Sequence, residues 1–237
     1  MTDRPRLSVL VPVYNEVGTV CTLLERVAAV PYSKEIIVVD DCSHDGTRAA
    51  LEAFRARTPD TSETRWIFAF HERNQGKGAA VRTAVGHVSG EIAIIQDADL
   101  EYDPNDYPRL VQPIDDGHAD VVFGSRFVGS PRRVLMFWHT VANRLLTLFS
   151  NMCTNMNLTD METCYKVFRA DVAKRIEIES RRFGVEPELT AKVARMKCRV
   201  YEVPVSYYGR DYAHGKKIGP LDAFEALWVI LKFNLFR

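Results

Sequence analysis

Residues 92–103 read Ile-Ala-Ile-Ile-Gln-Asp-Ala-Asp-Leu-Glu-Tyr-Asp, an apolar run that ends in alternating acids. Its apolar start is typical of a strand with both faces covered, as in a parallel sheet between two layers of helices. Its acidic end follows directly. In an open parallel sheet, ligands bind beyond the carboxyl ends of the strands. The stretch therefore predicts both the sheet and the edge of the sheet at which a ligand binds.

Similar apolar runs occur on both sides of this strand, and amphipathic stretches alternate with them. The predicted strands are Leu7–Val13, Glu35–Asp40, Arg65–Phe70, Ile92–Gln96 and Val121–Gly124. Apolar residues spaced three and four apart predict helices over Thr19–Val30, Thr47–Arg57, Gly78–His87 and Asn105–Asp116. This alternation indicates an α/β domain with a mostly parallel central sheet.

The second half of the chain is less regular. Its pattern predicts helices over Val134–Met156, Asp171–Ile176 and Pro187–Met196, and a strand over Val200–Tyr208. No Ser, Gly or Pro-rich linker separates the halves, so we expect one continuous domain.

Composition limits the class of protein. The chain has 237 residues, 46% of them hydrophobic, which is enough for one sizeable core. Lys and Arg together number 31, as do Asp and Glu, so the formal net charge is zero. This balance excludes a generally basic surface, and we expect no nucleic-acid partner. No stretch reaches the roughly 20 apolar residues of a membrane-spanning helix, and the first residues do not resemble a signal peptide. We therefore expect a cytoplasmic protein.

Several well-known site motifs are absent. The chain has no G-x-G-x-x-G dinucleotide fingerprint, no phosphate-binding P-loop, no G-x-S-x-G elbow and no H-E-x-x-H pair. Hydride transfer, ATP hydrolysis through a P-loop and serine hydrolase chemistry are therefore disfavoured. The segment Gln75-Gly-Lys-Gly78 opens a predicted helix, and it fits either an anion site made of backbone N–H groups or a plain tight turn.

The acids after the fourth strand favour a cation. Asp97, Asp99 and Glu101 alternate along the segment, so an extended backbone would place all three on one face. Two like charges about 4 Å apart repel by about 4 kcal/mol at an effective dielectric constant near 20. A divalent cation turns that repulsion into attraction, and oxygen ligands suit Mg²⁺ or Mn²⁺. The alternative is a solvated acidic loop that stabilises the next helix.

Six motifs in order carry a resemblance to a known family. They are V-P-V-Y-N-E (11–16), V-V-D-D-C-S-H-D-G-T (38–47), N-Q-G-K-G-A-A (74–80), D-A-D-L-E (97–101), G-S-R (124–126) and Y-G-R-D-Y-A-H-G-K-K-I-G (208–219). Together they resemble the family-two inverting glycosyltransferases, in particular the dolichol-phosphate mannose synthases and bacterial polyprenyl-phosphate sugar transferases. The match spans roughly residues 7–219.

The resemblance implies a GT-A fold over residues 1–219 and a role for individual residues. Asp99 and Glu101 would ligate Mg²⁺ or Mn²⁺, although many relatives have Gln at the position of Glu101. The residues implied to bind the nucleotide sugar are Pro12, Tyr14, Glu16, Val39, Asp41, Asp97, Ala98, Asp99, Arg126, Arg210 and Lys216. The donor would be a UDP- or GDP-sugar, and Asp99 and Arg126 would also act in catalysis.

The acceptor decides whether a base is needed. A phosphate monoester is ionised near neutral pH and can attack unaided, whereas a hydroxyl group needs a carboxylate to accept its proton. Asp160 and Glu162 lie where hydroxyl-glycosylating relatives keep that base, so Asp160 is a catalytic candidate for a hydroxyl acceptor. A polyprenyl phosphate is the expected acceptor, and a saccharide, peptide or small-molecule hydroxyl is the alternative. A more distant alternative is that the protein is a non-catalytic module that binds a nucleotide or acts as a membrane adaptor.

Two amphipathic segments suggest contact with a membrane surface. Leu135, Trp138, Leu145, Leu146 and Phe149 recur at helical spacing near arginines, and Leu221, Phe224, Leu227, Trp228, Leu231 and Leu235 do so near Lys232. We expect residues 220–237 to form a C-terminal amphipathic helix that packs on the domain or on the membrane surface.

Overall fold

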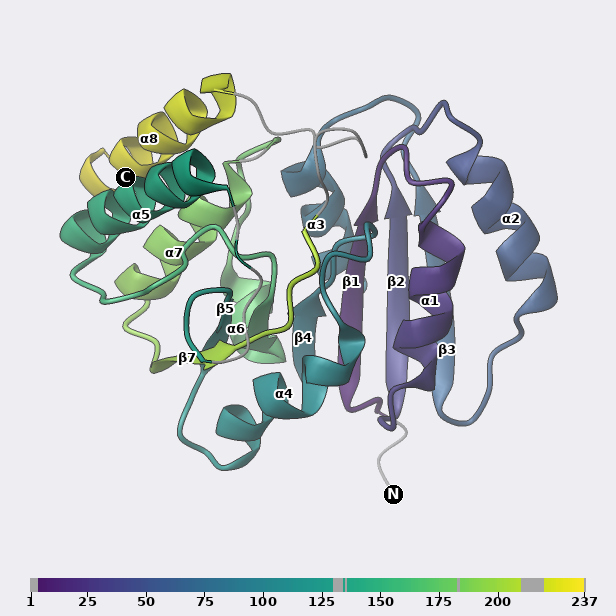
Figure 1. Cartoon of the computed structure of the whole chain (residues 1–237). Coiled ribbons are helices and arrows are strands. Elements are labelled where there is room, and N and C mark those ends of the chain that lie inside the picture. Colours follow the sequence, from purple (N-terminus) through teal and green to yellow (C-terminus); the bar gives the residue numbers. More distant parts are fainter. Residues whose placement is uncertain (1–3, 130–133, 135, 183, 210–219, 237) are drawn as a thin grey trace.

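The computed structural model describes residues 4–129, 134, 136–182, 184–209 and 220–236. Within these ranges the strands form one sheet in the order β3-β2-β1-β4-β6-β5-β7 (Figure 1). The strands are β1 (Leu7–Val13), β2 (Lys34–Asp40), β3 (Thr64–Phe70), β4 (Ile92–Ile95), β5 (Val121–Ser125), β6 (Lys166–Arg169) and β7 (Val200–Pro204). All residues of β1, β2 and β4 are buried, as the apolar runs predict for strands covered on both faces.

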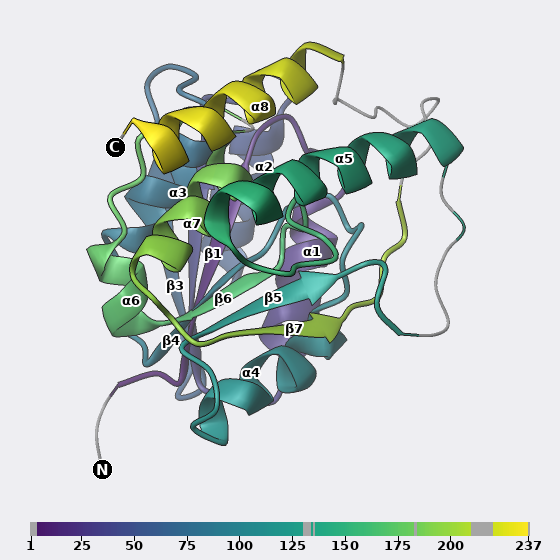
Figure 2. The ribbon, with the colours of Figure 1, turned by 90° about the vertical axis from the view of Figure 1, so that its left-hand side faces the viewer.

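Helices cover both faces of this sheet (Figure 2). They are α1 (Val20–Ala29), α2 (Thr47–Arg57), α3 (Lys77–Val85), the 3-10 turn η1 (Pro104–Asp106), α4 (Tyr107–Asp115), α5 (Phe137–Thr154), α6 (Ala170–Arg175), α7 (Val185–Arg195) and α8 (Pro220–Leu235). Helix α3 packs on β1 and β2, on the face opposite α1. The predicted α/β class is confirmed, because β1, β2, β3 and β4 pair in parallel.

Strand β6 is the main departure from the prediction. It pairs antiparallel with both β4 and β5, and the sequence pattern did not indicate it. The strand has only four residues and starts at Lys166, a charged residue that is fully buried. The Lys166 ammonium group donates to the carbonyl oxygens of Met161, at 2.9 Å, and Thr163, at 2.6 Å. Local pairing with carbonyl groups thus allows a charged residue in a strand that apolar patterning does not reveal.

Helices α5, α7 and α8 form a second layer beside the sheet. Figures 1 and 2 show α5 and α8 side by side, and α8 also packs on α7. Val229 and Phe233 of α8 are buried against Ala191 of α7. The inner face of α8 therefore packs on the domain. No helix within the described ranges has the length and apolar character needed to cross a bilayer.

Candidate active site

The segment that follows β4 is a turn, and the predicted extended backbone is wrong. Residues 98–101 bend, and Leu100 adopts a positive φ of 61°. Asp99 is held within this turn, because the backbone N–H of Glu101 donates to Asp99 Oδ1 at 3.1 Å. Tyr207 donates its hydroxyl group to Glu101 Oε2 at 2.8 Å. A local turn and a distant tyrosine thus orient these two carboxylates.

The donor set at Asp99 and Glu101 suits Mg²⁺ or Mn²⁺. Both residues offer carboxylate oxygens, and no group of three or more His, Cys, Asp or Glu able to hold a metal occurs among the described residues. Magnesium usually binds through one or two carboxylates and completes its shell with water and substrate phosphates. A pair of carboxylates at this sheet edge fits such a metal, and the predicted ligand roles of the two residues stay predictions.

Asp97 lies in an ion-pair chain that the sequence pattern did not indicate. Lys77 Nζ lies 2.8 Å from Asp97 Oδ1 and 2.8 Å from Glu186 Oε1. Burial alone would lower the pKa of Lys77, but Asp97 and Glu186 outweigh it and raise that pKa well above its ordinary value. The lysine therefore stays charged and links the start of α3 to Asp97 and to the start of α7. The signal in the sequence that could have indicated this contact is the position of Lys77 between Gly76 and Gly78.

Arg126 and Asp160 form a buried bidentate ion pair. Arg126 Nε donates to Asp160 Oδ2 at 2.7 Å, and an Arg126 terminal nitrogen donates to Oδ1 at 2.8 Å. Asp160 is fully buried, and Asn143 also donates to its Oδ1. The Arg126 guanidinium group lies 5.2 Å from the centre of the Tyr207 ring. Because both Asp160 oxygens accept hydrogen bonds, the geometry favours a positioning role for Asp160 over that of a base.

The residues predicted to surround the nucleoside lie together at the ends of β1 and β2. Pro12 and Val39 are partners in the β1–β2 register. The Tyr14 hydroxyl lies 3.1 Å from His44 Nε2, and Thr19 donates to Glu16 Oε2 at 2.8 Å. Their predicted contacts with a nucleoside stay predictions.

Asp41, which follows β2, stabilises the loop before α3. It is buried, and its carboxylate accepts from the backbone N–H groups of Gln75, at 2.9 Å, and Gly76, at 2.6 Å. His71 Nδ1 lies 2.7 Å from the same carboxylate. The sequence of residues 75–78 fits either an anion site or a plain tight turn. In the structure two of their backbone N–H groups bind the Asp41 carboxylate, which favours the turn. Asp41 fixes the loop that carries Lys77.

Two predicted phosphate contacts, Arg210 and Lys216, lie outside the described residues. Ala98, the remaining predicted contact, is buried between Asp97 and Asp99 in the turn after β4.

Glu162, the second candidate base, is held in an environment that favours its neutral form. Burial, followed by the nearby carboxylates of Glu186 and Asp160, raises the pKa of Glu162 to about 8, although Lys166 and Arg126 oppose this increase. Glu162 Oε1 is buried and has no hydrogen-bond partner among the described residues. Burial without a partner is the physical cause, since it penalises the ionised carboxylate.

The raised pKa predicts a stability that falls with pH. The folded protein keeps the Glu162 proton between the ordinary pKa of 4.5 and about 8, where the unfolded chain has lost it. This stabilisation is complete below about pH 4.5 and is lost as the pH rises through 8, with a slope of up to about 1.4 kcal/mol per pH unit. We expect Glu162→Gln to flatten this slope in urea unfolding measured across that range. An equal slope in both proteins would contradict the prediction.

Comparison with known protein families identifies similar sequences. The model of a family described as Glycosyl transferase family 2 matches residues 8–177. Undecaprenyl-phosphate mannosyltransferase of Micrococcus luteus is 30% identical over 225 residues, which cover 90% of this chain and 88% of that protein. Undecaprenyl-phosphate 4-deoxy-4-formamido-L-arabinose transferase of Edwardsiella ictaluri is also 30% identical, and the match covers 89% of this chain but only 62% of that protein.

A further relative and a solved structure extend the comparison. Dodecaprenyl-phosphate galacturonate synthase of Rhizobium johnstonii is 27% identical, with 97% of this chain and 67% of that protein covered. The structure of glucosyl-3-phosphoglycerate synthase from Mycobacterium tuberculosis, in complex with Mn²⁺, UDP and phosphoglyceric acid, is similar with a TM-score of 0.71. It is 17% identical, and the match covers 98% of this chain and 80% of that one, so it confirms the predicted GT-A fold alone.

Proposed function

Because the chain belongs to glycosyl transferase family 2, we propose that it transfers a sugar from a UDP- or GDP-sugar to a polyprenyl phosphate, with inversion at the anomeric carbon. The proposal of a polyprenyl-phosphate acceptor is supported by two relatives that match most of the chain, an undecaprenyl-phosphate mannosyltransferase and a dodecaprenyl-phosphate galacturonate synthase. The donor nucleotide is a proposal that follows from the sequence motifs, and the bound UDP of a structural neighbour is in keeping with it.

The Arg126–Asp160 ion pair is the observation that favours a phosphate monoester as the acceptor. Both oxygens of Asp160 accept hydrogen bonds from Arg126, at 2.7 and 2.8 Å, and Glu162 keeps its proton at neutral pH. Neither candidate base is thus placed to accept a proton from a hydroxyl group. A phosphate monoester needs no such base, because it is ionised already. The guanidinium group that Asp160 orients would bind phosphate oxygens.

The leaving diphosphate requires compensation of its developing charge. Asp99 and Glu101 would hold Mg²⁺ or Mn²⁺, which would supply that compensation when bound. Structural neighbours contain Mn²⁺ or Mg²⁺ together with UDP, in keeping with this assignment. The Lys77 ammonium group holds Asp97 in place beside these carboxylates.

A product assay tests this function. The protein, a polyprenyl phosphate, Mn²⁺ or Mg²⁺ and a panel of UDP- and GDP-sugars should yield a lipid-linked sugar and a free nucleoside diphosphate. Transfer only to a saccharide or another hydroxyl compound, with no lipid product, would reject the acceptor. Absence of nucleoside diphosphate release with every donor would instead favour the non-catalytic module.

We also propose that the reaction takes place on the cytoplasmic membrane face, with α5 and α8 in contact with lipid. Large apolar side chains remain exposed on both helices. Among them, Phe137 is 68% exposed and Trp138 75% on α5, and Phe224 is 70% and Trp228 59% on α8. These two helices lie side by side, so their exposed residues can face one bilayer surface (Figure 1).

Membrane contact predicts a loss of vesicle binding on removal of the aromatic side chains. Burial of one large apolar side chain contributes about 1.5–3 kcal/mol, so the double substitution Trp138→Ala and Trp228→Ala should weaken binding to lipid vesicles at least tenfold. Co-sedimentation with vesicles measures this. Tyr201→Ala is the matched control, because Tyr201 is an exposed aromatic residue on β7, away from α5 and α8. Equal binding by the double variant and the control would contradict the proposal.

A further inference from the structure

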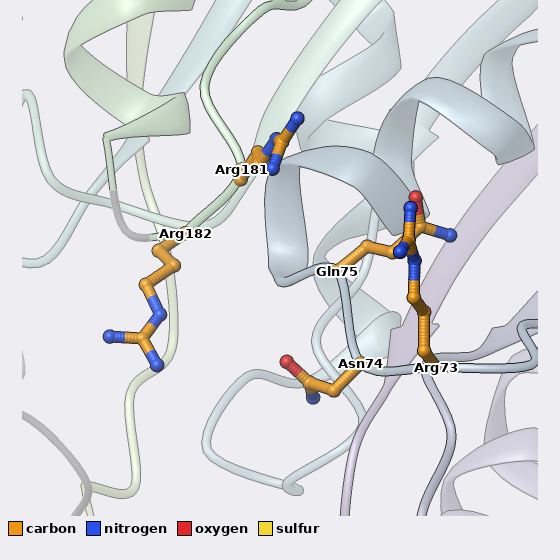
Figure 3. A pocket seen from close by; sticks show the side chains of 5 residues that line it. All are labelled: Arg73, Asn74, Gln75, Arg181 and Arg182. Carbon is orange, nitrogen blue, oxygen red and sulfur yellow. The ribbon is translucent and has the colours of Figure 1, made fainter.

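Three exposed arginines surround a polar pocket at the start of α3. The pocket has a volume of about 360 Å³ and is lined by Arg73, Asn74, Gln75, Arg181 and Arg182. Figure 3 shows that the first three come from the loop before α3 and the two others from the loop before α7, on opposite sides of the hollow. Segments distant in the sequence thus contribute positive charge to one place.

The positive charge of this pocket is not compensated. No carboxylate lines it, and within the described residues none of the three guanidinium groups has a hydrogen-bond or ion-pair partner. This differs from Lys77, which is paired with Asp97 and Glu186 nearby. Three like charges around one hollow repel each other, and an anion converts that repulsion into attraction. Guanidinium groups bind phosphate and carboxylate oxygens through two parallel hydrogen bonds.

The two loops are held against each other by backbone contacts. Gly78 N donates to the carbonyl oxygen of Arg181 at 3.0 Å. A Cβ atom on Gly76 would lie 2.1 Å from that oxygen, and one on Gly78 would lie 2.0 Å from the carbonyl oxygen of Ser180. Glycine at both positions therefore permits the close approach. The arginine side chains take no part in this packing, so they are free to bind a ligand.

From these observations we infer that Arg73, Arg181 and Arg182 form a phosphate-binding subsite. The inference rests on the proposed function, in which both substrates carry phosphate: the donor as a diphosphate and the acceptor as a monoester. The ion-pair chain of Lys77 and Asp97 connects the pocket to the turn at Asp99. The subsite is separate from Arg126, which lies beyond β4 and pairs with Asp160.

Phosphate binding can be measured without turnover. Inorganic phosphate and pyrophosphate are titrated into the full chain and followed by ³¹P NMR, for the wild type, for Arg73→Gln, and for the double substitution Arg181→Gln with Arg182→Gln. Loss of one charge-assisted contact should raise the dissociation constant about tenfold or more. Arg65→Gln is the matched control, because Arg65 is exposed near the opposite end of β3 and should bind as the wild type does. Wild-type affinity in the pocket variants, with unchanged thermal unfolding, would overturn the inference.

Kinetics then distinguish the two sources of phosphate. A raised KM for the sugar nucleotide alone assigns the subsite to the donor diphosphate, and a raised KM for polyprenyl phosphate alone assigns it to the acceptor. If neither constant changes, the pocket takes no part in substrate binding and the inference is overturned. Failure of the proposed function would look different: no lipid-linked sugar would form with the wild type, while phosphate binding would still depend on the arginines.

Discussion

Replacing Asp99 by Asn is expected to reduce sugar transfer by about a thousandfold or more. The substitution keeps the size of the side chain and the Oδ1 atom that accepts from the Glu101 backbone, so the turn after β4 should keep its shape. It removes the negative charge that would hold the divalent cation. Compensation of charge on a leaving group contributes several kcal/mol to catalysis, and about 1.4 kcal/mol corresponds to tenfold in rate. Formation of lipid-linked sugar at saturating donor and Mn²⁺ measures the effect.

Two neighbouring acids provide controls for Asp99. Glu101→Gln keeps an oxygen ligand and should lower the rate far less than Asp99→Asn, while raising the Mn²⁺ concentration needed for half-maximal activity. Asp103→Asn should leave the rate near that of the wild type, because Asp103 caps the η1 turn by accepting from the backbone N–H of Asn105. Turnover by Asp99→Asn close to the wild-type rate would contradict the proposed role of Asp99 in the metal site.

The parallel part of the fold could be predicted because its local pattern and its tertiary surroundings agree. The run Leu7–Val13 is apolar apart from Ser8, and all seven of its residues are buried. Spacing of apolar residues likewise predicted α2 with the bounds that the structure shows. Strand β6 could not be predicted, because its burial of Lys166 depends on carbonyl groups supplied by the preceding turn.

The residues of the candidate site likewise fall into those that the sequence pattern indicates and those that it does not. The acids after β4 and Arg126 after β5 could be predicted as site residues because ligands bind beyond the strand ends in this class of fold, and their roles stay predictions. Glu186 and Tyr207 were missed, since neither follows a predicted strand end in a recognisable motif, and each reaches the site only through a contact with a distant residue. The predicted alternation over Asp97, Asp99 and Glu101 was wrong because Leu100 adopts a positive φ and turns the chain.

Breaking the Arg126–Asp160 pair should have the largest effect on stability. In Asp160→Asn, the guanidinium group of Arg126 stays mostly buried but loses the carboxylate that pairs with it at 2.7 Å. An unpaired buried charge costs about 3–5 kcal/mol, so we expect the free energy of unfolding in urea to fall by about that amount. Lipid-linked transfer should fall as well, through a higher KM for polyprenyl phosphate, because Arg126 is no longer held in one orientation.

A double variant separates this loss of stability from the loss of activity. Arg126→Met combined with Asp160→Leu removes both charges and should restore most of the free energy of unfolding, because apolar residues of similar volume replace a buried ion pair at little cost. Transfer should stay low, since the guanidinium group is absent. If Asp160 were instead the base for a hydroxyl acceptor, Asp160→Asn would abolish transfer to that hydroxyl without weakening its binding. Stability and acceptor affinity measured on the same three proteins therefore decide between a carboxylate that orients Arg126 and one that accepts a proton.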